Sequence, residues 1–127
     1  MKYSDYIGIP FQYGGRTKTS LDCYGLVMLL YKDFKNIELP EVTSTAILSH
    51  AASLIEQESH NWKPCSIDEE GAVIIFSIKG YGAHVAYVIS HDKMIHAWEG
   101  SGGVCIERIS GSWKHRILGC YKYDKNN

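Results

Sequence analysis

The chain has 127 residues, 45% of them apolar and 21% charged, so we expect one globular domain over residues 1–127 with a single core. Thirteen Lys and Arg against fourteen Asp and Glu give a net charge of −1, which offers no basic surplus for nucleic-acid binding. No apolar run approaches the roughly 18 residues that cross a bilayer, and the N-terminus does not resemble a secretory signal peptide. Neither a membrane span nor signal-directed export is therefore expected.

The first half of the chain is predicted to be helical. A short helix over residues 1–7 would end at a glycine, and the double glycine at residues 14–15 would turn the backbone back toward the next helix. Asp22 is a good N-cap for that next helix, which is predicted to run to about Lys35. Its apolar residues recur at the three-and-four spacing of one buried face: Cys23, Leu26, Val27, Leu30 and Phe34. Serine and threonine N-caps at residues 43–45 predict a further helix to about residue 58.

The second half changes to the patterns of β-strands after a polar loop over Ser59–Gly71. Five strands are predicted, at Ala72–Ile78, Ala83–Ile89, Lys93–Trp98, Val104–Ile109 and Arg116–Tyr123. Helices first and strands afterwards are typical of an α+β domain. We therefore expect the N-terminal helices to pack on a five-stranded antiparallel sheet.

Cys23 is the residue on which the predicted chemistry depends. It lies in the first turn of its helix, where unpaired backbone N–H groups and the positive end of the helix dipole favour a thiolate over a thiol. The other cysteines, Cys65, Cys105 and Cys120, are widely spaced and form no C-x-x-C pair. We expect them to be reduced, with core or incidental roles. Cys23, by contrast, is placed as a nucleophile.

Two histidines of the predicted hairpin complete a candidate site. His84 and His96 lie twelve residues apart, with the hairpin tip near Ser90 midway between them. Side chains alternate faces along a strand, so this even separation predicts both imidazoles on one face, directly opposite each other at roughly 5 Å between Cβ atoms. If the sheet packs this end of the hairpin against the start of the Cys23 helix, the three residues form a nucleophile, a base and an orienting group.

Four segments resemble, in order, the NlpC-type family of papain-like cell-wall cysteine peptidases: Gly8–Gly15, Asp22–Val27, His84–Ile89 and Met94–Ala97. The resemblance extends from about Tyr6 to Tyr121, and the two histidines have the family's spacing. It implies the papain-like NlpC-type fold for the α+β domain. The aromatic Tyr24 after the cysteine is similar to the subset found with phage tails, where a tail-tip peptidase opens the wall during infection.

The resemblance implies hydrolysis of an amide in the peptide stem of peptidoglycan, typically the bond between γ-D-glutamate and the following diamino acid. Cys23 would attack the carbonyl, His84 would accept and return the proton, and His96 would hold the His84 ring. The backbone N–H of Cys23 would stabilise the oxyanion, in agreement with its place at a helix terminus. No metal or organic cofactor is implied.

The same resemblance indicates residues that would contact the substrate. Asp22 lies at a position that can help to recognise the free amine of a stem peptide. The family usually has tyrosine at the position of Phe11, where its hydroxyl lies by the active cysteine, and phenylalanine cannot donate that hydrogen bond. Tyr13 and Tyr24 are the candidates to replace it. Tyr24 also stands where serine is common, so the contacts beside the nucleophile are expected to differ.

Three other functions use the same residues. One is a structural or assembly component of a phage-tail-like particle with little catalysis, which Phe11 and Tyr24 favour. Another is a thiol acyltransferase or deamidase, because fold and catalytic residues do not fix the substrate. A third is a zinc site at Cys23, His84 and His96, which the lack of closely spaced ligands disfavours. For the peptidase we expect synthesis in the cytoplasm and action at the cell wall, within a phage-tail-like particle or after unconventional export.

Overall fold

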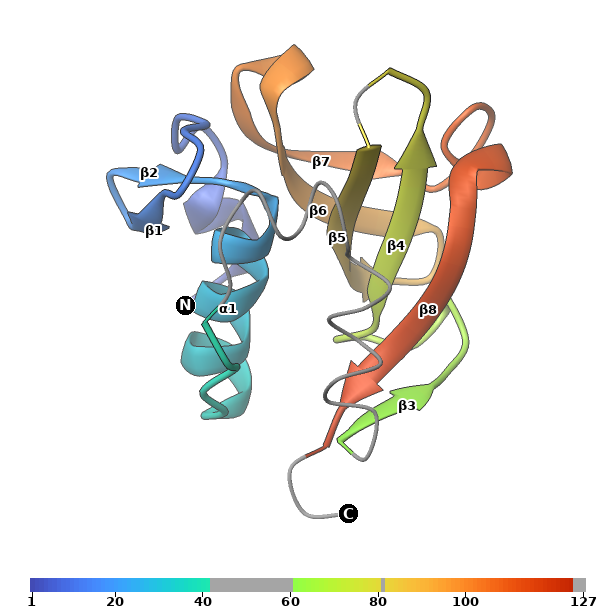
Figure 1. The fold of residues 1–127 in the computed structure, drawn as a ribbon. Coiled ribbons are helices and arrows are strands. Elements are labelled where there is room, and N and C mark those ends of the chain that lie inside the picture. The colour runs from blue at the N-terminus through green and yellow to red at the C-terminus, as the bar shows by residue number, and fades with distance from the viewer. Residues whose placement is uncertain (42–60, 81, 125–127) are drawn as a thin grey trace.

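The fold is one α-helix packed beside one curved antiparallel sheet (Figure 1). The computed structural model describes residues 1–41, 61–80 and 82–124. The helix predicted from residue 43 to about 58 lies outside the described residues. Within those ranges, no helix combines the length and apolar character that crossing a membrane requires. The predicted α+β class, with a helix on an antiparallel sheet, is confirmed.

The helix α1, Cys23–Lys35, begins and ends close to where the sequence predicts. The side chain of Asp22 caps it by accepting a hydrogen bond from the Gly25 backbone N–H at 2.7 Å. Asn36 ends it in the left-handed conformation, with φ of 55°. A Cβ atom on Gly25 would lie only 2.2 Å from the Gly15 carbonyl oxygen, so the close approach of the double-glycine turn requires glycine there.

The main sheet has six strands in the order β3-β8-β4-β5-β6-β7, and every neighbouring pair is antiparallel. Its strands are β3 Trp62–Pro64, β4 Val73–Ile78, β5 Gly82–Ser90, β6 Lys93–Trp98, β7 Gly103–Arg108 and β8 Ile117–Tyr123. Five of them match the five predicted strands, with no end shifted by more than one residue. The sixth, β3, lies in the segment predicted to be loop.

Short elements at the edges of the fold were harder to foresee. The strand β3 has three residues and pairs only with β8, and a run that short shows no alternation to detect. A two-stranded ribbon that was not predicted, β1 Arg16–Thr17 and β2 Ser20–Leu21, forms before α1. At the N-terminus the predicted helix is a single 3₁₀ turn, η1 Tyr3–Tyr6. Two further 3₁₀ turns are η2 Glu99–Ser101 and η3 Lys114–Arg116.

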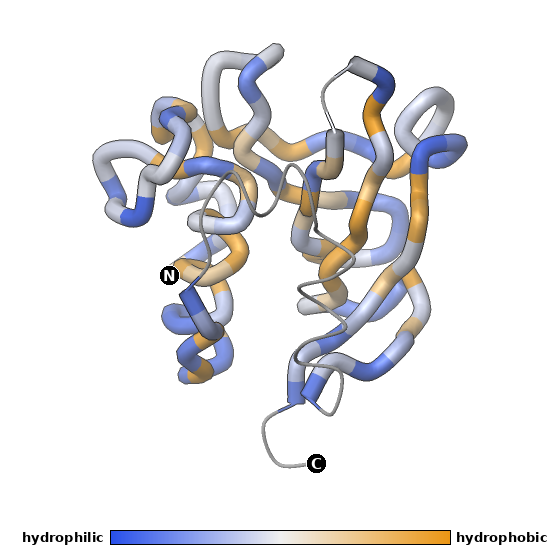
Figure 2. Tube along the Cα trace, viewed as in Figure 1, coloured by the Kyte–Doolittle hydropathy of each residue, from blue (hydrophilic) through white to orange (hydrophobic). Residues whose placement is uncertain are grey.

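The two faces of the sheet bury different side chains. Alternate strand residues, among them Val85 and Tyr87, pack against α1 and form a helix-side core. The residues between them, among them Phe76 and Ala86, face away from α1 and form a far-side core, which Trp98 and Trp113 help to cover. Figure 2 shows apolar residues concentrated along the central strands, with hydrophilic residues at the loops and chain ends. The strands β4 and β5 are therefore covered on both faces, as their long apolar runs predict.

Candidate active site

Cys23 is the first residue of α1 and is 4% exposed. The ladder between β5 and β6 covers Tyr87–Ser90 and Lys93–Ile95 only, so the start of β5 pairs with β4 alone. The backbone N–H of Val85, in that unpaired stretch, donates a hydrogen bond to the Cys23 sulfur. Because strand N–H groups point within the plane of a sheet, the sulfur lies at the level of the sheet, beside the residue that follows His84.

The thiol of Cys23 is not predisposed to ionise in this structure. Burial raises its pKa to about 12, and the charge of Asp22 adds to the rise. Hydrogen bonds from the backbone N–H groups of Val85 and Tyr24, and the charge of Arg16, only partly offset the rise. The expectation that the helix terminus alone would favour a thiolate is therefore wrong, because desolvation at this buried position is the larger effect.

The histidine pair lies in the far-side core, and its register differs from the predicted one. Both imidazoles share one face of the sheet, as the even spacing predicts, and both residues are 0% exposed. The ladder aligns Tyr87 with Ile95, so His96 lies two residues away from the position opposite His84. The hairpin turns at residues 91–92 and not at Ser90, which moves the register, and a bulge between Val88 and Ser90 adjusts it by one residue so that the two histidines share a face. The two rings are diagonal neighbours and not direct partners.

A continuous hydrogen-bonded chain runs from this pair to a carboxylate. His84 Nε2 lies 2.7 Å from His96 Nδ1, and His96 Nε2 lies 2.6 Å from Glu107 Oε2. The other ring nitrogen, His84 Nδ1, is buried and has no hydrogen-bond partner among the described residues. An unpaired buried acceptor or donor is costly and is commonly retained at functional sites. His84 directly precedes Val85, whose backbone N–H donates to the Cys23 sulfur.

Glu107 is a residue of this site that the sequence did not indicate. It extends from β7, where Cys105 is paired directly with His96 and Glu107 follows on the same face two residues later. Its carboxylate also accepts hydrogen bonds from the indole N–H of Trp113 and from the Cys105 thiol. The register of β6 and β7 was the missing information, because a lone glutamate at the end of an apolar strand looks like an ordinary surface residue.

Aromatic side chains surround the histidine pair. The ring of His84 lies 6.0 Å from that of Phe76, 4.8 Å from that of Trp98 and 5.7 Å from that of Trp113, measured between centroids. Trp113 also packs edge-on against His96 at 5.0 Å. These rings keep water from the two imidazoles. Trp98 and Trp113 thus pack against the far-side core and lie over the histidine pair.

Burial shifts the pKa of each group in the chain. Desolvation lowers the pKa of His84 well below its usual 6.5, and the neighbouring His96 adds to the decrease. Desolvation also lowers the pKa of His96, although Glu107 offsets part of it. For Glu107, burial raises the pKa, but the hydrogen bonds from His96, Trp113 and Cys105 outweigh it and the net shift is downward. At neutral pH the two imidazoles are therefore neutral and the carboxylate is charged.

Of the four residues predicted to contact the substrate, two are committed to internal contacts. Asp22 is 2% exposed, and its carboxylate accepts hydrogen bonds from the Gly14 and Gly25 N–H groups and pairs with Arg16 at 2.5 Å. Tyr24 is 6% exposed and its hydroxyl donates to the Pro40 carbonyl at 2.9 Å. These contacts secure the start of α1, and a role for either side chain in binding substrate stays a prediction.

The other two lie in the loop before α1. Phe11 is half-buried and packs edge-on against Tyr13, with ring centroids 5.0 Å apart. The Tyr13 side chain is exposed, and its hydroxyl donates to Glu99 at 2.5 Å. Backbone bonds tie this loop to the sheet, since the N–H of Phe11 donates to the Gly102 carbonyl. Phe11 and Tyr13 together form an aromatic surface next to the strand that precedes Cys23, and their contact with substrate stays a prediction.

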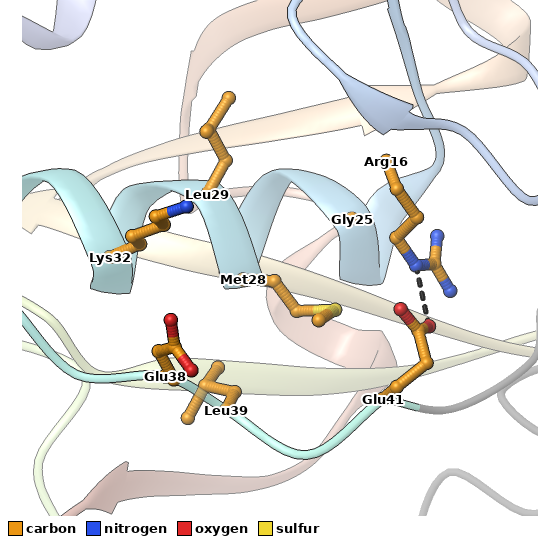
Figure 3. Close-up of a pocket in the computed structure, with 8 residues that line it drawn as sticks. All are labelled: Arg16, Gly25, Met28, Leu29, Lys32, Glu38, Leu39 and Glu41. Atoms are coloured by element: carbon orange, nitrogen blue, oxygen red, sulfur yellow. Dashed lines mark hydrogen bonds and ion pairs between the residues drawn. The ribbon is translucent and has the colours of Figure 1, made fainter.

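Two cavities flank the start of α1 and the histidine pair. One, of about 300 Å³, lies along α1 and is lined by Arg16, Gly25, Met28, Leu29, Lys32, Glu38, Leu39 and Glu41 (Figure 3). In it, Arg16 Nε donates to Glu41 at 2.7 Å. A second, of about 360 Å³, is lined by Glu107, Trp98, Trp113, Ser101 and Arg116 among others. Cys23 lines neither cavity. The second cavity exposes the Glu107 carboxylate, where the hydrogen-bonded chain from the histidines ends, to solvent.

One group of side chains in the described residues has the spacing of metal ligands. The ligand atoms of His96, Cys105 and Glu107 all lie within 4.8 Å of one another. Hydrogen bonds between Glu107 and each of the other two already use these atoms. The zinc set of Cys23, His84 and His96 considered from the sequence is not among such groups in the described part of the chain.

Comparison with known proteins agrees with this geometry. The profile of the NlpC/P60 family matches residues 8–122. The chain is 27% identical over 115 residues to an Escherichia coli protein named murein DD-endopeptidase MepS/murein LD-carboxypeptidase, covering 91% of this chain and 56% of that protein. It is 26% identical over 119 residues to the probable peptidoglycan endopeptidase LytE of Bacillus subtilis, covering 92% and 31%. The chain thus spans about half or less of the length of these relatives.

Solved structures share the fold. The NlpC/p60 domain of the peptidoglycan hydrolase SagA superposes with a TM-score of 0.64 at 20% identity, covering 92% of this chain and 89% of that one. An NlpC/P60 family protein from Bacillus cereus gives a TM-score of 0.69 at 22% identity, covering 94% and 37%. The family match over residues 8–122 spans the helix that begins at Cys23 and the strands that carry both histidines. The chain belongs to the NlpC/P60 family.

Proposed function

We propose that the protein is a cysteine peptidase that hydrolyses amide bonds in the peptide stems of peptidoglycan. The observation that carries the proposal is the buried hydrogen-bonded chain from Glu107 through His96 to His84, whose unpaired Nδ1 belongs to the residue before Val85, the donor to the Cys23 sulfur. A nucleophile, a base and a group that orients the base are the parts that thiol hydrolysis needs. Relatives named as murein and peptidoglycan endopeptidases support the choice of substrate.

In the proposed reaction His84 Nδ1 takes the proton of the Cys23 thiol as the sulfur attacks the substrate carbonyl. The backbone N–H of Cys23 makes no hydrogen bond within the described residues, so it is available to the oxyanion at the positive end of α1. His84 then returns the proton to the leaving amine, which breaks the amide and leaves an acyl-enzyme. Water, deprotonated by the same nitrogen, releases the acid and restores the thiol.

The pKa directions favour a proton transfer that accompanies attack over an ion pair formed beforehand. Burial raises the pKa of Cys23 and lowers that of His84, so the resting site is a neutral thiol beside a neutral imidazole. The charge separation that proton transfer from Cys23 to His84 creates costs less free energy during attack on the substrate. The negative charge then moves to the substrate oxyanion, which the helix terminus stabilises. Charge develops during the reaction and not before it, which suits a buried site.

We further propose that the bond cut is the one between γ-D-glutamate and the following diamino acid, as the family resemblance implies. Digestion of purified peptidoglycan followed by mass measurement of the released fragments identifies the bond directly. Fragments cleaved elsewhere in the stem would contradict this assignment while leaving the peptidase chemistry intact. Transfer of the acyl group to an amine, or release of ammonia alone, would instead indicate the acyltransferase or deamidase alternative.

The variant Cys23→Ala tests the mechanism, because it removes the only atom proposed to bond to the substrate. We expect release of stem fragments to fall by about a thousandfold or more, with the thermal unfolding temperature nearly unchanged. Cys65→Ser, which changes a half-buried cysteine outside the site, is the matched control and should keep full activity. Hydrolysis that survives in Cys23→Ala would rule out the proposed mechanism.

Delivery to the cell wall as part of a phage-tail-like particle, or by unconventional export, is a proposal that follows from the resemblance. The relatives matched are named as endopeptidases and not as tail proteins. Copurification of the protein with tail particles would support the first route. An inert protein that still assembles into such particles as Cys23→Ala would support the structural alternative.

A further inference from the structure

We infer that Glu107 is a positioning residue that fixes the tautomers of both histidines, so that His84 Nδ1 carries a lone pair and can act as the base. The consequence for catalysis rests on the proposed function. The hydrogen-bonded chain itself rests on geometry alone: 2.7 Å between the imidazoles and 2.6 Å from His96 to Glu107.

The direction of each hydrogen bond follows from what the atoms can do. An ionised carboxylate only accepts, so His96 must carry its proton on Nε2 and donate it to Glu107. A neutral imidazole has one N–H, and therefore His96 Nδ1 is an acceptor. His84 must then donate from Nε2, which leaves Nδ1 of His84 unprotonated. The carboxylate fixes the tautomer of His96, and the tautomer of His96 then fixes that of His84.

Glu107 is built to act as an acceptor in this chain. Three donors converge on its carboxylate: the His96 ring, the Trp113 indole and the Cys105 thiol. These contacts hold the side chain in one orientation and stabilise its ionised form. Its side chain is 40% exposed, so it can ionise against the cavity while His96 beneath it is fully buried. The charge therefore stays at the rim and the imidazoles inside stay neutral.

An amide in place of this carboxylate would remove the preference. A glutamine can accept through oxygen or donate through nitrogen, so His96 could take either tautomer. With the proton on His96 Nδ1, His84 Nε2 would have to accept, and the proton of His84 would move to Nδ1. That tautomer cannot receive the Cys23 proton. Glu107→Gln therefore keeps the shape of the side chain. It changes only which atoms donate and which accept along the hydrogen bonds from Glu107 to His84.

The test uses Glu107→Gln with Glu69→Gln, an exposed glutamate in the loop after β3, as the matched control. Nitrogen-15 spectra of the imidazoles report which ring nitrogens of His84 and His96 are protonated. We expect the wild type to show both protons on Nε2, and Glu107→Gln to show a mixture or a reversal. We also expect kcat to fall about 10- to 100-fold with KM within about twofold.

The rate of Cys23 alkylation by iodoacetamide, located by mass spectrometry, provides a readout that needs no peptidoglycan. It should fall in Glu107→Gln and stay unchanged in Glu69→Gln, because alkylation also requires loss of the thiol proton to His84. Unchanged tautomers or unchanged alkylation in Glu107→Gln would overturn the inference, even if kcat fell. A wild type that shows these tautomers but does not cut peptidoglycan would contradict the proposed function alone. If Glu107→Gln does not fold, the wild-type nitrogen-15 spectra alone decide, and a proton on His84 Nδ1 would overturn the inference.

A separate pair of cysteines lies in contact away from this site. The sulfur atoms of Cys65 and Cys120 are 3.7 Å apart, and the Cys65 N–H donates to the Cys120 carbonyl, which extends the β3–β8 ladder by one residue. Both side chains are half-buried, and Cys65 lines a cavity of about 360 Å³. We propose that this pair forms a disulfide when the protein meets an oxidant.

The chemistry needs a disulfide as the co-reactant, such as oxidised glutathione. The Cys65 thiolate attacks one sulfur of that disulfide and expels a thiol, and the Cys120 thiolate then attacks the mixed disulfide and expels the second. Two protein thiols are oxidised and one external disulfide is reduced to two thiols, which take up the two protons that the protein thiols lose. The sulfurs must approach from 3.7 Å to bonding distance, which side-chain rotation of two facing residues allows.

Incubation with oxidised glutathione, followed by intact-mass measurement and peptide mapping, tests this pair. We expect the loss of two hydrogens, a peptide linking Cys65 to Cys120, and an unfolding temperature raised by about 5 °C or more, reversed by dithiothreitol. Cys120→Ser should abolish the change, and Cys105→Ser should not. Stable glutathione adducts without the linked peptide, or a link that includes Cys105, would overturn the proposal.

Discussion

The side of the sheet that packs on α1 and the side that carries the histidines are built from alternate residues of the same strands. On the helix side, Val85 and Tyr87 join an apolar core with the buried face of α1. On the far side, His84 and His96 are just as buried but polar, and one nitrogen of His84 is left unpaired in the described structure. One side gains stability by removing apolar area from water, and on the other side a buried, unpaired nitrogen costs stability.

The comparison teaches where this protein can be changed. Substitutions in the helix-side core should alter stability and leave the chemistry of each folded molecule intact. Changes to the hydrogen-bonded chain of Glu107, His96 and His84 should alter the chemistry of each folded molecule more than its stability. The Val85 N–H, in the stretch of β5 that does not pair with β6, donates to the Cys23 sulfur, which links a residue of the helix-side core to the strand that carries His84.

The largest effect should come from Leu30→Ala, which removes a fully buried side chain from the face of α1 that packs on the sheet. We expect the free energy of unfolding to fall by about 3 kcal/mol, from lost apolar burial and the cavity left behind. Urea denaturation measures this loss. Hydrolysis per folded molecule should change less than twofold, and a large loss of kcat at temperatures where the variant is folded would break the comparison.

The second-largest effect should come from acid, which lowers the free energy of unfolding through the buried histidines of the far side. His84 and His96 have pKa values lowered by burial, so below pH 6.5 the unfolded chain takes up protons that the folded protein refuses. Stability is therefore full above pH 6.5 and is lost as the pH falls below it, by up to about 1.4 kcal/mol per pH unit for each histidine. Urea denaturation between pH 7 and pH 5 measures the slope. His84→Asn should flatten it, whereas His115→Asn, an exposed histidine, should not.

Tyr31→Phe tests a polar contact on the helix side. Its hydroxyl donates to the Gly71 carbonyl at 2.5 Å and accepts from the Tyr123 N–H at 3.3 Å, both in buried positions. Removing it leaves two backbone groups unpaired, so we expect a loss of about 1.5 kcal/mol on unfolding. Activity of the folded variant should stay near wild type. A selective loss of kcat would show that the helix side also tunes the chemistry.

The smallest effect is expected for Arg108→Ala, which breaks an exposed ion pair with Asp92 at 3.0 Å. Exposed pairs contribute little because water and salt screen them, so stability should change by about 0.5 kcal/mol or less. Arg108 adjoins Glu107 in β7, so this variant also controls for disturbance of the strand. A fall in kcat as large as that expected for Glu107→Gln would indicate that strand geometry, and not the carboxylate, controls the site.

Local patterns predicted the elements well. Asp22 as N-cap, the apolar spacing of α1 and the alternation in β5 and β6 depend on contacts a few residues apart, which the sequence records directly. The three-residue β3 was missed because its pairing with β8 joins residues some sixty positions apart. The prediction of a directly opposed histidine pair was wrong for a related reason, since the hairpin turns at residues 91–92 and not at Ser90.

By itself the sequence determined that a cysteine begins a capped helix, that two histidines share one face of a hairpin, and that the fold is α+β. Only the tertiary structure decided that burial keeps Cys23 protonated, that Val85 holds its sulfur, and that Glu107 completes the histidine chain. The reason is that desolvation and hydrogen bonding between distant strands depend on which side chains meet in space. Periodicity fixes the face a residue occupies, and register fixes its neighbours.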